Sequence, residues 1–128
     1  MRDIKFRAWN FQLKKYIKAI EMNITGNMVR TRDEKFYAPF EVALEQYTGL
    51  KDKNSVEIYE GDLIEAKNAT YKVEWFNTAF WVVPVLGYGN SQPISKLYDY
   101  EENNELKVIG NIHENADLLE GYHEVTKK

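Results

Sequence analysis

Short runs in which every second side chain is apolar recur along this chain, and this period of two constrains its fold more than any other feature. Residues 4–9 and 71–76 both show the pattern. Successive side chains of a β-strand point to opposite faces, so the pattern predicts half-buried strands. Phe, Trp and Tyr make up 14% of the chain, and such residues favour pleated surfaces. We predict a mainly β fold of the β-rich α+β class, with one or two short helices.

Some segments between these runs predict a particular local structure. Residues 40–45 alternate in polarity and follow Pro39, which favours a strand over a helix. Residues 94–98 place apolar side chains at i, i+3 and i+4, which predicts a short helix that starts at Pro93. Asn115 resembles a helix N-cap, so we expect a second short helix near the C-terminus.

The length predicts one domain, residues 1–128, because a chain of this size can bury a sizeable core. Apolar residues make up 44% of the chain, a fraction too high for an intrinsically disordered protein. A turn signal at Gly26-Asn27 and the charged run at residues 31–35 predict loops, so we expect a variable loop region at residues 21–40. We expect residues 122–128 to form a frayed tail.

The chain has no cysteine, which excludes disulfides, thiolate metal sites and a cysteine nucleophile. The first residues lack the apolar core of a signal peptide, and no apolar run approaches the ~20 residues of a membrane helix. We therefore expect a cytoplasmic protein that needs no membrane and no cofactor.

The stretch Gln46–Ile64 combines a polar turn with two glycines and alternating apolar positions. Asp52–Ser55 has the composition of a β-turn, and Asn54 tolerates left-handed φ better than the serine after it. Gly61 is expected at positive φ in a tight bend, with Asp62 bonded to nearby backbone amides. The stretch therefore predicts tightly specified backbone.

Three blocks, residues 4–10, 46–64 and 108–119, resemble in their order the motifs of the YopX family, whose members are small uncharacterised proteins of bacteriophages and prophages. The resemblance implies a phage or prophage origin and a barrel-like domain, here a small, antiparallel, partly open barrel. It implies no reaction. The residues that we assign to the structural signature are Tyr47, Gly49, Gly61, Asp62, Gly110 and Asn111, with Gly110 expected at a β-bulge.

An apolar run at residues 80–83 is expected in a buried strand or at an interface, because both of its faces are apolar. Pro84 cannot donate to a strand ladder, so it predicts a strand end or a sheet edge. An apolar edge favours pairing with another chain, so we expect a homo-oligomer. The predicted interface residues are Phe80, Trp81, Val83 and Val85.

Charge is unevenly distributed along the sequence. Residues 1–53 carry eleven Lys and Arg against seven Asp and Glu, a balance of +4, whereas residues 54–128 carry six against thirteen, a balance of −7. The two parts could neutralise each other, or the basic part could bind nucleic acid. The residues that would form such a basic hairpin with stacking aromatics are Arg2, Arg7, Trp9, Lys14, Lys15 and Lys18.

Catalysis has little support in the sequence. His113 and His123 are the only histidines, and neither belongs to a metal-binding motif, so we assign no metal ligand and no catalytic residue. The acids that an enzyme could use lie in the signature: Glu57, Glu60, Asp62 and Glu65. The leading hypothesis is a non-enzymatic protein-interaction module that self-associates and binds a phage or host protein. The alternatives are a nucleic-acid-binding accessory protein and an enzyme that uses the signature carboxylates.

Overall fold

The computed structural model describes residues 5–22, 29–31, 35–66, 69–87, 89–100 and 105–117. The chain divides into two compact units, Met1–Gly49 and Leu50–Lys128. Several predictions lie outside the described residues: Arg2, His123, the tail 122–128, and residues 23–28 and 32–34 of the expected loop region.

The first unit holds five strands of an antiparallel sheet, in the order β4-β3-β2-β1-β5, and a sixth strand of this sheet, β6 (Glu57–Tyr59), follows β5 in the order and belongs to the second unit. Its elements are β1 (Phe6–Asn10), β2 (Lys15–Met22), β3 (Val29–Thr31), β4 (Phe36–Tyr37), the 3-10 helix η1 (Pro39–Glu41) and β5 (Val42–Lys51), the last of which continues into the second unit. Ala8 lies at the centre of β1, opposite Ile17 of β2 and Leu44 of β5. Two short strands, β3 and β4, thus occur where the sequence predicted a loop region.

The strand predicted over residues 40–45 begins two residues later, at Val42, because η1 precedes it. Pro39 supplies a φ that suits a helical turn, and the Glu41 carboxylate accepts a hydrogen bond from the Ala38 amide at 2.8 Å. Phe40 therefore lies in η1 instead of the sheet, and its side chain is 83% exposed. The alternating pattern did not reveal this local capping.

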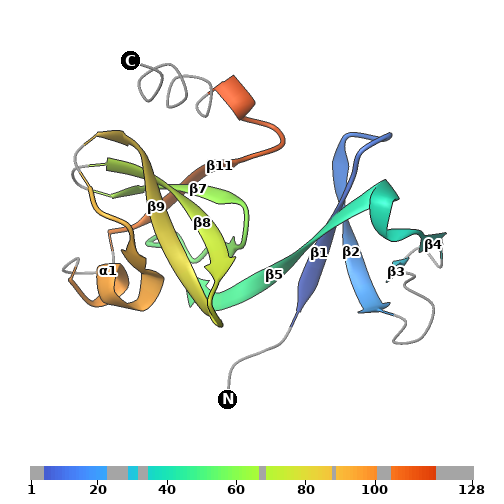
Figure 1. Ribbon diagram of the computed structural model, residues 1–128, viewed down its shortest axis with the longest axis horizontal. Coiled ribbons are helices and arrows are strands. Elements are labelled where there is room, and N and C mark those ends of the chain that lie inside the picture. Colours follow the sequence, from blue (N-terminus) through green and yellow to red (C-terminus); the bar gives the residue numbers. More distant parts are fainter. Residues whose placement is uncertain are drawn as a thin grey trace. The chain divides into compact units, whose positions relative to one another are not determined.

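The second unit contains a five-stranded antiparallel sheet with the order β10-β9-β8-β7-β11, which curls into a half-barrel (Figure 1). Its elements are β6 (Glu57–Tyr59), β7 (Asp62–Ala66), β8 (Ala69–Phe76), β9 (Ala79–Gly87), β10 (Gln92–Pro93), α1 (Ile94–Tyr100) and β11 (Lys107–Asn111). The predicted helix after Pro93 is confirmed as α1. The mainly β class and the partly open barrel are confirmed as well.

Apolar side chains from the sheet and from α1 form the core of the second unit. Ile94 and Leu97 contribute the helix side of this core. The buried members from other elements are Ile58, Ile64, Ala66, Ala69, Tyr71, Val73, Phe80, Val82 and Leu106. Strands β7, β8 and β9 supply seven of these nine, in agreement with the period of two in their sequences.

Backbone irregularities lie near the expected places, with two differences. Gly61 has a φ of 87°, and the β11 register shifts between Val108 and Gly110, as predicted. In the 52–55 turn, however, the positive φ of 65° belongs to Ser55 and not to Asn54. Pro84 lies inside β9 at a register shift opposite Tyr71, where the strand does not need its amide.

Candidate functional site

The Asp52 carboxylate is the centre of the family-like stretch, and only 6% of the residue is exposed. One carboxylate oxygen, Oδ1, accepts hydrogen bonds from the amides of Asn54 at 2.8 Å and Val56 at 2.9 Å, and the other, Oδ2, accepts one from Val108 at 2.8 Å. The Lys53 amide donates to the Leu106 carbonyl at 2.9 Å. Asp52 thus fixes its own turn and also fastens that turn to β11, the edge strand of the second unit.

Opposing influences act on the pKa of Asp52. Burial raises the pKa of this carboxyl, whereas hydrogen bonds from the Val108, Val56 and Asn54 amides and the charge of Lys53 lower it, and the pKa lies below its usual value of 3.8 as a result. A carboxylate that accepts several amide hydrogen bonds is stabilised in its charged form. These bonds use the oxygens that an acid–base catalyst would need, so Asp52 is structural.

Asp62 and Gly61 form the bend between β6 and β7. The Asp62 carboxylate accepts a hydrogen bond from the Tyr59 amide at 2.8 Å and is 2% exposed. The Gly61 amide donates to the Val73 carbonyl, while its own carbonyl accepts from the Ile112 amide, both at 2.9 Å. Gly61 therefore connects three segments of the second unit through its backbone.

Asn111 has the same role at the end of β11. Its side-chain oxygen accepts hydrogen bonds from the amides of His113 and Glu114, at 3.0 and 2.9 Å. The Asn115 side chain bonds back to the Asn111 amide, and a Cβ at Gly110 would collide with that side chain. Glycine is therefore required at position 110 by the close approach of Asn115.

In the first unit, the side chains predicted to bind nucleic acid divide into a half-buried and an exposed group. Arg7 donates to the Glu45 carboxylate at 3.0 Å, and the Tyr16 hydroxyl donates to the same oxygen at 3.0 Å. The Arg7 guanidinium also lies 4.0 Å from the centre of the Tyr16 ring, which contacts Trp9 edge-on at 4.9 Å. Arg7 and Trp9 thus belong to this interior network.

Lys14 and Lys15 are exposed at the turn between β1 and β2. Lys18 lies opposite Arg7 in the strand register, and its side chain is outside the described part of the chain. The structure therefore does not bring all the predicted basic residues to one face. Tyr47, a signature residue, is buried, and the Lys5 ammonium lies 4.9 Å from the centre of its ring.

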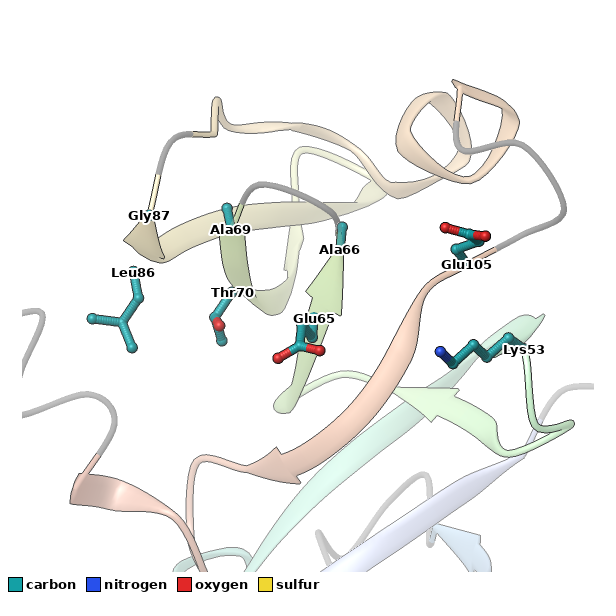
Figure 2. Close-up of a pocket in the computed structure, with 8 residues that line it drawn as sticks. All are labelled: Lys53, Glu65, Ala66, Ala69, Thr70, Leu86, Gly87 and Glu105. Carbon is teal, nitrogen blue, oxygen red and sulfur yellow. The ribbon is translucent and has the colours of Figure 1, made fainter.

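The remaining acids of the signature do not converge on one point. Glu57 accepts a hydrogen bond from the Tyr59 hydroxyl at 3.4 Å. Glu65 is exposed and lines an open cleft of about 360 Å³, together with Lys53, Ala66, Ala69, Thr70, Leu86, Gly87 and Glu105. Figure 2 shows Lys53 and Glu105 at one end of this cleft and Leu86 at the other. Within the described residues, no three His, Asp or Glu side chains are grouped in a way that could hold a metal ion.

The predicted interface residues also differ in exposure. Phe80 and Val85 are buried, whereas Trp81 and Val83 are half-buried on the opposite face of β9. The larger exposed apolar area of this hairpin lies at its end, where Trp75 is 44% and Phe76 is 65% exposed. These two positions were not predicted as an interface, because the alternating polarity of residues 71–76 assigned them to the body of a strand.

We call Trp75, Phe76 and Trp81 the aromatic tip. The Trp81 indole donates a hydrogen bond to the Phe76 carbonyl at 3.0 Å, and the two rings meet edge-to-face at 6.4 Å. Trp75 contacts Phe80 in the same manner at 4.7 Å. The tip is thus held in place although it is open to solvent.

Comparison with known proteins identifies the family of the chain. The family described as YopX protein matches residues 5–120. The chain belongs to the YopX family. Its predicted resemblance is therefore confirmed over most of its length. No curated protein matches the chain.

A solved structure with the same fold is the crystal structure of protein EF1440 from Enterococcus faecalis. It is 23% identical in sequence, covers 93% of this chain and 99% of its own, and has a TM-score of 0.61. This similarity establishes a shared fold for this YopX chain. In the described part of the chain, no helix is long and apolar enough to span a membrane.

Proposed function

We propose that this YopX protein is a non-enzymatic protein-interaction module that self-associates through its aromatic tip. The observation that carries the proposal is the exposed Phe76 side chain, which is held by an edge-to-face contact with the half-buried Trp81 and by the hydrogen bond from the Trp81 indole to the Phe76 carbonyl. Aromatic anchors that are already ordered lose little conformational entropy on binding. They are therefore effective contacts for another protein.

The backbone at the tip supports the same proposal. Asn77 and Thr78 have φ values of 53° and 62° in the two-residue turn between β8 and β9. A β-branched residue in this region is unusual and strained, at a cost of roughly 1–2 kcal/mol. Strain of this kind often marks functional segments. Here it accompanies a sharp turn that presents Phe76 to solvent.

A second copy of the chain is the partner that this surface favours. Lys72 and Glu74 lie on β8 near the tip and pair with each other at 3.4 Å, so their charges balance. A two-fold contact brings a surface against its own copy, and an apolar surface with balanced charge avoids repulsion there. Pairing through the part of β9 that the short β10 leaves uncovered is less favoured, because Pro84 has no amide hydrogen to donate to a new strand.

Light scattering coupled to size exclusion tests this proposal. The 15.1 kDa chain is expected to elute with about twice that mass. Phe76→Ser should give a monomer, whereas Phe40→Ser, an equally polar change of an exposed phenylalanine in the first unit, should leave the dimer intact. A wild-type monomer at high concentration overturns self-association. A dimeric Phe76→Ser variant overturns the assignment to the aromatic tip.

We propose further that the protein is encoded by a phage or prophage, acts in the cytoplasm of the bacterial host, and binds a phage or host protein as well as its own copy. The support is the family to which the chain belongs, together with a sequence free of cysteine, which needs no oxidising compartment. Fractionation of infected cells, followed by detection of the protein with an antibody, tests the compartment. Recovery outside the cytoplasmic fraction contradicts it.

A further inference from the structure

We propose that the first unit binds single-stranded nucleic acid through a surface formed by Phe11, Lys14, Lys15 and Phe40, which we call the basic tip. This surface lies at the turn between β1 and β2 and at the neighbouring η1. It is distinct from the aromatic tip of the second unit. The inference is therefore independent of the proposed self-association, and either can fail without the other.

The backbone brings the two parts of the basic tip together. The Phe11 amide donates a hydrogen bond to the Glu41 carbonyl at 3.3 Å, which places η1 beside the hairpin turn. Figure 1 shows the short green coil that leads into β5 next to the blue turn. The buried Asn10 side chain accepts hydrogen bonds from the Gln12 and Leu13 amides, both at 2.9 Å, so the turn has a defined shape.

Two phenylalanine side chains are exposed at this surface. Phe40 is 83% exposed and Phe11 is 50% exposed. Aromatic rings on a protein surface stack with unpaired bases regardless of sequence, because every base has a flat π-face. Bases in a duplex are already stacked on one another, so a single strand is the form that such rings can bind.

The charge of the basic tip complements a phosphate backbone. Lys14 and Lys15 are exposed, and neither has a carboxylate partner among the described residues. Glu41 of η1 is also exposed and accepts a hydrogen bond from the Ala38 amide, whereas the buried Glu45 is shared by Arg7 and Tyr16. Two exposed lysines against one exposed carboxylate leave a positive balance among the described residues of this tip.

The combination of rings and cations identifies the ligand class. An acidic peptide would use the lysines but gain little from two exposed phenylalanines, whereas a single strand uses both groups. Binding to phosphates releases counterions, so the affinity should fall as salt rises, by a slope that counts the cations involved. The Phe40 ring and the two lysines can therefore be tested separately.

Fluorescence anisotropy with a labelled thymidine oligonucleotide of roughly 15 nucleotides, titrated from about 20 mM salt upward, measures this binding. Lys14→Ala combined with Lys15→Ala should reduce the magnitude of the slope of log affinity against log salt by about 1.4, since each cation contributes about 0.7 on single strands. Phe40→Ser should weaken binding roughly 5- to 150-fold at fixed salt. A uridine oligonucleotide should behave in the same way.

Matched controls use the second unit. Lys96→Ala combined with Lys107→Ala removes the same charge from exposed positions and should leave the slope unchanged, and Leu86→Ser, at an exposed apolar position outside both tips, should leave the affinity unchanged. Absence of an anisotropy change for the wild type at low salt overturns the proposal, as does an equal loss in both double-lysine variants. Polyglutamate could also bind as tightly as the oligonucleotide, with an affinity that Phe40→Ser does not change. That result would assign the surface to an acidic protein and would overturn the proposal.

Discussion

The two units of this protein are stabilised by different kinds of interior. In the first, Arg7, Tyr16 and Glu45 form a charged network beside a small apolar cluster around Ala8 and Val42. In the second, a cluster of eleven buried apolar residues fills the half-barrel, contributed by four strands, by the segment before β11 and by α1. We therefore expect the removal of a charge to destabilise the first unit most, whereas the removal of apolar volume should destabilise the second unit most.

Both units nevertheless share one device, a buried Asp or Asn side chain that bonds to backbone amides at a turn. Asn10 does so in the first unit, and Asp52, Asp62 and Asn111 do so in the second. All four residues lie in the blocks 4–10, 46–64 and 108–119, which resemble the motifs of the YopX family. The motifs therefore specify the buried side chains that stabilise these turns. The exposed aromatic side chains of the two tips are not among them.

Removal of apolar volume from the second unit should have the largest effect on stability. Ile64→Ala deletes a fully buried side chain and should lower the free energy of unfolding by about 2–5 kcal/mol. Leu86→Ala, at a 38% exposed position of β9, should cost less than about 1.5 kcal/mol. Urea denaturation measures both. Equal losses in the two variants would mean that the apolar cluster does not dominate this unit.

The charged network of the first unit provides the next largest effect. Glu45→Gln leaves the half-buried Arg7 guanidinium without its counter-charge and should cost about 2–3 kcal/mol. Replacement of both partners, Arg7→Met with Glu45→Met, should recover most of this loss because no uncompensated charge remains. Urea unfolding of the wild type and the two variants decides the point. A double variant that is less stable than Glu45→Gln contradicts it.

Acid should weaken the second unit through Asp52. Because the folded pKa of this group is lowered from 3.8, its contribution to stability is present above about pH 4 and is lost as the pH falls through the lower folded value. Asp52→Asn should cost about 1–2 kcal/mol at neutral pH. The same change should reduce the loss of stability between neutral pH and pH 3. Urea titrations at both pH values measure this, and an unaltered pH dependence in the variant would contradict the assignment.

The smallest effect concerns the strained turn of the aromatic tip. Thr78→Gly relieves a β-branched residue at a φ of 62° and should raise stability by about 0.5–1 kcal/mol, after the greater chain entropy of glycine is subtracted. Ser91→Gly, an exposed change at ordinary φ, should give no gain. Thermal unfolding compares the two. A destabilised Thr78→Gly variant would show that the turn is not strained.

The sequence predicted the fold class, the helix after Pro93, the positive φ of Gly61 and the bulge at Gly110. These features arise from local rules, namely the period of two, the fixed φ of proline and the freedom of glycine. The YopX resemblance was also visible in the sequence. The structural role of Asp62 followed from its place beside Gly61, since short acidic side chains commonly bond to backbone at bends.

Other features depended on contacts that no local rule contains. The bond from Asp52 to Val108 joins residues 56 positions apart and fixes a turn in which Ser55 takes the positive φ. Phe40 lies in η1 because the Glu41 side chain caps it. The exposure of Phe76 depends on where β8 ends, and the alternating pattern continues through that residue. The two proposed binding surfaces were accordingly predicted only in part. Lys14, Lys15 and Trp81 were among the predicted residues, whereas the aromatic side chains beside them were not.

The central claim is that the family motif holds the fold while the exposed tips bind. Stability and solution mass, measured together on Asp52→Asn and Phe76→Ser, test it most directly. Asp52→Asn should lose about 1–2 kcal/mol of unfolding free energy and keep the mass of a dimer, whereas Phe76→Ser should keep its stability and elute as a monomer. The reverse result, a stable but monomeric Asp52→Asn protein beside a dimeric Phe76→Ser protein, would contradict the claim.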